Sequence, residues 1–294
     1  MRSAEAPPAR ALDPAAPGGR GRLRLAARQP ALLLSGAILL LFLLVALVGP
    51  WIAPHDPVRS HPGLNYQPPS GQFWLGTDKS GRDVFSRVIV GTRYTLLGGF
   101  GVMAIAALGG FLCGLVTAYV GGWLDRLAMR LFDLMLSVPP LITAFVLVAI
   151  MGPGLGPVVL GVGLGYLPAI ARIIRSEALI ERSNQYVAAA QGLGYSAPRI
   201  VFGQMMPNVT SQIIVQASMN LPYAIIDIAG LSFLGFGIQP PTPDWGSMLA
   251  EGSRVVDLAP WMVLAPGAAV TTLVLAWNVF GARLRRALDP RSRR

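Results

Sequence analysis

Few side chains in this sequence are suited to acid–base, nucleophilic or metal chemistry. The chain holds two histidines, His55 and His61, and one cysteine, Cys113. A single cysteine excludes an internal disulfide and a cysteine-based zinc site, and we interpret the two histidines, which lie in a proline-rich stretch, as loop residues rather than a metal pair. No combination of Ser, His, Asp and Glu suggests hydrolysis. We therefore expect no catalytic residue and no metal site.

The only lysine, Lys79, bears on nucleotide binding. A phosphate-binding P-loop has the form G-x-x-x-x-G-K-[ST], in which the lysine reaches the phosphates. Lys79 follows Asp78 instead of glycine, so the chain has no P-loop. The G-x-G spacings at 161–165 lie in an apolar run and are interpreted as packing glycines. We expect this chain to bind no cofactor, and any ATP and magnesium to be bound by partner subunits.

One acidic residue, Asp227, lies in a predicted membrane span. Ion-driven carriers place ionisable residues inside spans, so Asp227 could belong to a proton relay. The alternative is a side chain that faces a water-filled pathway or is hydrogen-bonded to Ser232 or Asn220. Asp227 and Asn220 are the candidate pathway-lining residues.

The polar segment 177–208 is unusual for a loop between membrane spans. Asn184 can cap a short helix through Ala188–Ala190, and Gly194 can end it in a left-handed conformation. An interfacial helix that only floats on lipid has a strong apolar face, whereas this one is rich in Ala and Gly and favours docking of a partner protein. The candidate docking-loop residues are Asn184, Tyr186, Ala189, Ala190, Gly194 and Pro207.

The elements that position these residues follow from composition. The chain has 294 residues, of which 53% are apolar and 13% charged, with a mean hydropathy of +0.55. Soluble domains have about 25% charged residues, so a soluble enzyme and a disordered chain are both excluded. The charge-free runs are 31–49, 94–124, 134–171, 200–226 and 258–282.

About 20 apolar residues cross a bilayer, so the run 134–171 is too long for one helix. It is interrupted at 151–157 by glycines and prolines, and we expect two helices joined by a tight turn there. The sequence thus predicts six transmembrane helices. A cleaved signal peptide at the first run is the less favoured alternative, because its apolar core would be too long.

We divide the chain into four parts. These are a disordered basic cytoplasmic tail (1–28), a first transmembrane helix with an external loop (29–92), a five-helix core that includes the loop at about 177–208 (93–283), and a cytoplasmic tail (284–294). Small residues in the second run, Gly110 and Gly114 among them, favour close helix packing.

Orientation follows from the 24 basic residues, because cytoplasmic loops carry the excess of Arg and Lys. Assigning alternate loops to opposite sides places 18 of the 24 on the side of both termini and 6 on the other. Both termini are therefore expected in the cytoplasm of a multi-pass protein of a bacterial inner membrane. The net charge of +10 is interpreted as topology signal and contact with lipid headgroups, not as nucleic-acid binding.

Several motifs resemble those of a known family. The stretch Tyr186-Val-Ala-Ala-Ala-Gln-Gly-Leu-Gly194, followed by Pro207-Asn208, resembles the EAA loop of bacterial ABC importer permeases. The stretches that begin at Leu75, Leu231 and Leu288 are similar to segments of dipeptide, oligopeptide and nickel permeases. Together they resemble the second of the two paired permeases over roughly residues 30–291.

The resemblance implies an all-α polytopic membrane protein with six transmembrane helices and a cytoplasmic coupling-helix (EAA) loop. It implies a transport subunit for peptides or related solutes and not an enzyme. The expected partners are a homologous permease, two ATP-binding subunits, an extracytoplasmic substrate-binding protein and membrane lipid. The exact substrate is left open.

The sequence departs from the family pattern at two positions. Ala188 replaces the acid at the start of the EAA pattern. The salt bridge or cap that the acid would make is therefore missing or supplied by a neighbour such as Glu181. A second acid would stand at Ile228 and is present one place earlier, at Asp227. Two other functions remain in competition: a stand-alone secondary carrier or channel, which needs intramembrane ion-coupling residues, and a membrane-embedded enzyme.

Overall fold

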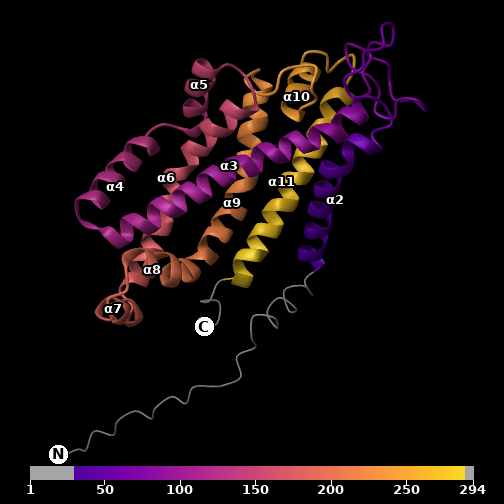
Figure 1. The fold of residues 1–294 in the computed structure, drawn as a ribbon. Coiled ribbons are helices and arrows are strands. Elements are labelled where there is room, and N and C mark those ends of the chain that lie inside the picture. Colours follow the sequence, from indigo (N-terminus) through magenta and orange to yellow (C-terminus); the bar gives the residue numbers. More distant parts are fainter. Residues whose placement is uncertain (1–29, 289–294) are drawn as a thin grey trace, which may run out of the picture.

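The computed structural model describes residues 30–288, and every regular element in that range is a helix (Figure 1). The predicted disordered tail at 1–28 and residues 289–294 lie outside the described range. The N-terminal end of α2, the C-terminal end of α11 and the short helices α7 and α8 lie at one end of the bundle. The segment between α2 and α3, together with α10, lies at the other end.

The first span is α2, Pro30–Ile52, which contains the predicted run 31–49. Its 23 residues measure about 35 Å at 1.5 Å per residue, enough to cross the hydrocarbon core. Most of its leucines are exposed, as expected of a lipid-facing helix at the edge of a bundle.

The second span, α3, Val84–Val120, is the central helix and crosses the length of the bundle (Figure 1). It starts ten residues before the predicted run because Asp83 caps it, its carboxylate accepting hydrogen bonds from the backbone N–H groups of Phe85 and Ser86. It ends before Leu124 because Gly121 and Gly122 adopt positive φ angles of 67° and 65°.

The third span is broken. Helices α4, Gly122–Leu136, and α5, Pro140–Met151, meet at an angle of 86°. The expectation of a continuous helix from Leu134 is wrong because Pro139 and Pro140 interrupt the backbone hydrogen bonds. Five helices are long and apolar enough to cross a membrane by themselves, and the bent pair α4–α5 brings the number to six when it is counted as one span.

The turn predicted at 151–157 is confirmed, since only three residues separate the end of α5 from the start of α6. Helix α6, Leu155–Arg182, leads to α7, Gln185–Gly192, and α8, Ala197–Ile200. A π-helical turn, η1 at Val201–Met205, joins α8 to the fifth span, α9, Met206–Phe233.

The chain ends with α10, Trp245–Ser253, and the sixth span, α11, Trp261–Leu288. Residues 284–288, which the sequence placed in a cytoplasmic tail, therefore continue α11. The described chain has an all-helical fold, as predicted.

Small residues let α3 and α6 approach closely, as the sequence indicated. A Cβ atom at Gly114 would lie 2.5 Å from the carbonyl oxygen of Ala171, and one at Gly110 would lie 2.9 Å from that of Leu167. The α3–α6 interface is thus built on direct backbone contact, which gives the bundle a fixed centre.

Candidate functional site

Helix α7 lies outside the bundle, at the end that holds both ends of the described chain (Figure 1). Its C-terminal end is a Schellman motif. Gly194 has a φ of 74° and donates its N–H to Gln191 O at 3.0 Å, and the N–H of Tyr195 bonds to Ala190 O at 3.1 Å. The left-handed glycine predicted at position 194 is confirmed.

Asn184 stands at the N-cap position of α7, with an extended backbone, but its side chain forms no capping hydrogen bond. The prediction of a side-chain cap is wrong. Its backbone carbonyl contributes instead, accepting the N–H groups of Val187 at 3.1 Å and Ala188 at 3.5 Å. The start of α7 therefore depends on other contacts.

The two faces of α7 have different environments. Val187 and Ala190 are buried against the rest of the chain, at 1% and 4% exposure. Ala189 is exposed on the outer face. Leu193, which the sequence reasoning did not single out, is 74% exposed. The sequence did contain a signal for an exposed contact residue here, since Leu193 is a large apolar side chain between two glycines in a polar loop.

Three side chains hold α7 to the bundle, and we call them the Glu181 clamp: Glu181 at the end of α6, Tyr186 on α7 and Asn208 on α9. The Tyr186 hydroxyl donates to Glu181 Oε1 at 2.7 Å, and Asn208 Nδ2 donates to the same oxygen at 2.7 Å. Partial burial and the bond to Glu181 raise the pKa of Tyr186 to about 12. The phenol therefore remains a donor at physiological pH.

Pro207 explains the irregular start of α9. It has no N–H to donate to the residue four places earlier, and the chain forms a π-helical turn just before it, in which the N–H of Met206 bonds to Val201 O. The side chain of Asn208, the next residue, reaches the clamp. Pro207 itself is exposed.

Asp227 lies in the last two turns of α9, is half-buried, and bonds to neither of the partners suggested by the sequence. Its Oδ2 accepts the hydroxyl of Tyr166 on α6 at 2.8 Å. Asn220 donates to Gln216 O within α9 at 2.8 Å. The suggested bonds from Asp227 to Ser232 or Asn220 are therefore wrong, and Tyr166 was missed because it is 61 residues away in the sequence.

Asp227 and Asn220 belong to a longer row of polar residues along α9. The spacing of 4, 4, 3 and 4 residues places the row within about 80° of the helix circumference and extends it over about 22 Å. One end of it is fixed by Glu177 of α6, which accepts a hydrogen bond from Gln212 at 3.0 Å. We call this row the α9 polar stripe: Gln212, Gln216, Asn220, Tyr223 and Asp227.

The stripe borders the open side of α9. Tyr223 is 57% exposed and the other four residues are half-buried. The exposed positions of α2 are by contrast almost all apolar. Polar side chains that face lipid are costly, so the open side of α9 is suited to water or protein, as expected of a pathway wall.

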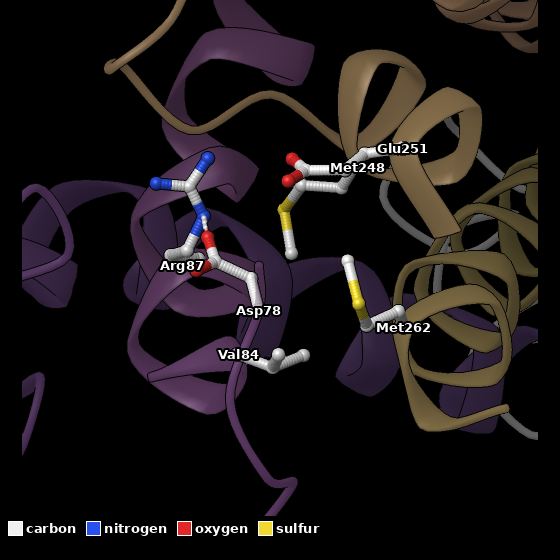
Figure 2. A pocket seen from close by; sticks show the side chains of 6 residues that line it. All are labelled: Asp78, Val84, Arg87, Met248, Glu251 and Met262. Carbon is white, nitrogen blue, oxygen red and sulfur yellow. Dashed lines mark ion pairs between the residues drawn. The ribbon is translucent and has the colours of Figure 1, made fainter. Parts of the chain in front are cut away.

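At the opposite end of the bundle, charged side chains tie the external segment to α3 and α10. Asp78 Oδ2 lies 2.6 Å from Arg82 Nε and 3.5 Å from Arg87 Nε. Figure 2 shows Arg87 and Asp78 facing Met248 and Glu251 across a cavity of about 10 Å³, near the lower limit for one water molecule. Arg87 also donates to the backbone carbonyls of Pro57 and Pro241, at 2.8 and 3.1 Å.

A wider cavity of about 350 Å³ opens beside this cluster. Its lining includes Lys79, Gln239, Glu251 and Arg254. Its volume falls within the roughly 300–1,000 Å³ typical of small-molecule pockets. The sequence assigned no role to these residues, because they come together only through the fold.

The histidines are loop residues in the structure. His55 Nδ1 lies 3.2 Å from Asp83 Oδ2, and His61 Nδ1 lies 3.2 Å from the carbonyl of Gly81. Within residues 30–288, no three His, Cys, Asp or Glu side chains are grouped so that they could hold a metal ion.

Two family models match the chain. Residues 110–294 match the binding-protein-dependent transport system inner membrane component, and residues 23–69 match the N-terminal transmembrane domain of oligopeptide transport permease C. The chain is 40% identical over 264 residues to the di/tripeptide transport system permease protein DppC of Pseudomonas aeruginosa, covering 87% of each chain. It is 38% identical to the dipeptide permease DppC of Alkalihalophilus pseudofirmus, covering 85% of this chain and 82% of the relative.

A third relative is the glutathione transport system permease protein GsiD of Pectobacterium atrosepticum, 37% identical over 90% of this chain and 88% of the relative. The chain belongs to the inner-membrane permease family of binding-protein-dependent ABC importers, in its oligopeptide and dipeptide permease C branch. It is a multi-pass inner-membrane transport subunit and not an enzyme.

Proposed function

We propose that this chain is the permease subunit of an ATP-driven importer of peptides, that it forms the translocation pathway with a homologous permease, and that α7 is its coupling helix. The observation that supports coupling is the position of α7. It lies beyond the bundle, is held by the Glu181 clamp, and turns Ala189 and Leu193 outward. A helix fixed at its base and apolar at its tip suits insertion into a cleft of an ATPase.

The position of α7 and the family of the chain support a set of partners. Two ATPases bind ATP and magnesium below the permease pair, and one receives α7 of this chain. The α9 polar stripe, with Asn220 and Asp227, faces the pathway. An extracytoplasmic binding protein delivers the peptide at the end that holds α10. The excess of basic residues counted above supports a cytoplasmic location for both termini and α7.

Peptide is the proposed substrate class because relatives that cover most of the chain are named for dipeptides, di/tripeptides and glutathione. All three are small solutes with peptide bonds and free ionic groups. The binding protein makes the first selection among such solutes and delivers them to the permease.

The decisive experiment is co-expression of this chain with the permease and ATPases encoded beside it. We expect a complex that retains the ATPases through purification. After reconstitution with the binding protein, we expect this complex to take up peptide when ATP is supplied. Ala189→Glu is expected to release the ATPases while the chain remains in the membrane; Ser183→Glu, just outside α7, is the matched control. Recovery of wild-type chain without ATPase, or uptake that follows a proton gradient without ATP, contradicts the proposal and favours a secondary carrier.

A further inference from the structure

Among residues 30–288, Asp227 is an acid without a counter-ion. It is the only residue of α9 with an acidic or basic side chain, and none of the ion pairs found among residues 30–288 includes it. Its one hydrogen-bond partner in that range is the hydroxyl of Tyr166. The side chain is half-buried.

A lone carboxylate inside a membrane span costs on the order of 3 kcal/mol on insertion scales. A structural role does not require this cost, because an asparagine could accept the same hydrogen bond from Tyr166. What an aspartate adds is a negative charge, which a cation that reaches the open side of α9 would neutralise. The α9 polar stripe provides a polar route onward from that position.

We propose that Asp227 is a specificity-determining residue that binds the terminal ammonium group of the peptide during its passage, and that Tyr166 is the positioning residue that orients the carboxylate. This proposal rests on the proposed function. Tyr166 occupies one acceptor site of Oδ2, while Oδ1 accepts no hydrogen bond from the described residues. The remaining acceptors match the three donors of an ammonium group.

Geometry supports a transient contact rather than a tight site. Within the described part of the chain the carboxylate has one neutral partner and no surrounding cage, and the stripe continues from it toward Tyr223 and Asn220 with hydroxyl and amide groups. An ammonium group can therefore bind at Asp227 and leave toward Asn220, which lies seven residues, or about 10 Å, further along the axis of α9. The site would favour substrates with a free amine over blocked or anionic ones.

The test uses the complete importer in lipid vesicles, with its binding protein preloaded separately with alanyl-alanine or with N-acetyl-alanyl-alanine. Rates are expressed per loaded binding protein, so that selection by the binding protein is removed. Wild type is expected to transport the free dipeptide about tenfold faster, the effect of roughly 1.4 kcal/mol for one charge-assisted hydrogen bond. Asp227→Asn is expected to bring the ratio of the two rates near one by slowing the free dipeptide only.

Two further variants separate a charge effect from a structural one. Asn220→Asp combined with Asp227→Asn returns a carboxylate to the stripe and is expected to restore part of the preference. Asp133→Asn, an exposed aspartate on α4, is the matched control and leaves the preference unchanged. A wild-type ratio near one, or an equal loss of both rates in Asp227→Asn without rescue, overturns the proposal. If wild type shows no ATP-dependent uptake at all, the proposed function itself fails.

Discussion

At the residue scale, the orientation of α7 depends on few contacts. Glu181 Oε1 receives both the Tyr186 hydroxyl and the Asn208 amide, so one oxygen joins α6, α7 and α9. Helix α7 has only eight residues, too few to be stable in isolation. Its orientation is therefore set by this oxygen, by two buried side chains and by the turn at Gly194.

Loss of the clamp should loosen α7 without unfolding the bundle. In Glu181→Ala the Tyr186 hydroxyl and the Asn208 amide lose their acceptor, and each lost hydrogen bond should cost about 1 kcal/mol of stability. We expect transport to fall about tenfold while ATP hydrolysis by the complex continues. Measuring both rates on the same preparation tests this, with Glu181→Gln, which can still accept, as the milder control. Equal transport in Glu181→Ala and wild type would show that the clamp does not position α7.

Substitutions at Gly194 should follow backbone preference rather than size. Its φ of 74° costs a residue with a Cβ about 1–2 kcal/mol, although the space beside it is open. Asn tolerates this region better than β-branched residues. We expect Gly194→Val to lower uptake more than Gly194→Asn, with equal amounts of protein in the membrane. The reverse order in an uptake assay would contradict a backbone cause.

At the element scale, the α3–α6 contact fixes the centre of the bundle, and glycine is required only where backbones meet. Gly114→Ala places a methyl group against Ala171 O and should cost about 1–3 kcal/mol. Gly156→Ala, in an open part of α6, is the matched control and should be neutral or slightly stabilising. Thermal unfolding of the purified complex distinguishes the two. Equal melting temperatures would mean that α3 and α6 can separate at no cost.

Much of the arrangement of helices and turns was predictable from the sequence. Charge-free runs locate membrane helices because hydrocarbon excludes charge, and the turn at 151–157 follows from its glycines and prolines. The break between α4 and α5 was missed because Val138-Pro-Pro140 lies inside an apolar run. The sequence named Glu181 as a substitute for the missing acid, but its bond to Asn208, 27 residues away, and the Tyr166–Asp227 bond, 61 residues apart, were missed. Periodicity carries no information on which helices become neighbours.

At the scale of the whole molecule, the proposed orientation predicts which serines face which compartment. Ser183 beside α7 and Ser253 at the end of α10 are both exposed and lie at opposite ends of the bundle. In a Cys113→Ser background, we expect Ser253→Cys to react with a membrane-impermeant maleimide in intact spheroplasts. Ser183→Cys should react only after permeabilisation. The opposite pattern would invert the topology and place α7 outside the cell.

The bend between α4 and α5 has a consequence for biogenesis. The 12 residues of α5 measure about 18 Å, so α5 is too short to be held in the bilayer as an independent stop-transfer segment. It is closely apposed to α6, where a Cβ atom at Gly165 would lie 2.7 Å from the Cα of Pro140. We expect the translocon to release α4, α5 and α6 into lipid together, as one hairpin. A nascent chain that stops after Met151 is already held in the membrane by α2 and α3. In a Cys113→Ser background, a cysteine introduced into α5 of that chain should stay reactive to a water-soluble maleimide, whereas in a chain that extends past Arg182 it should be protected.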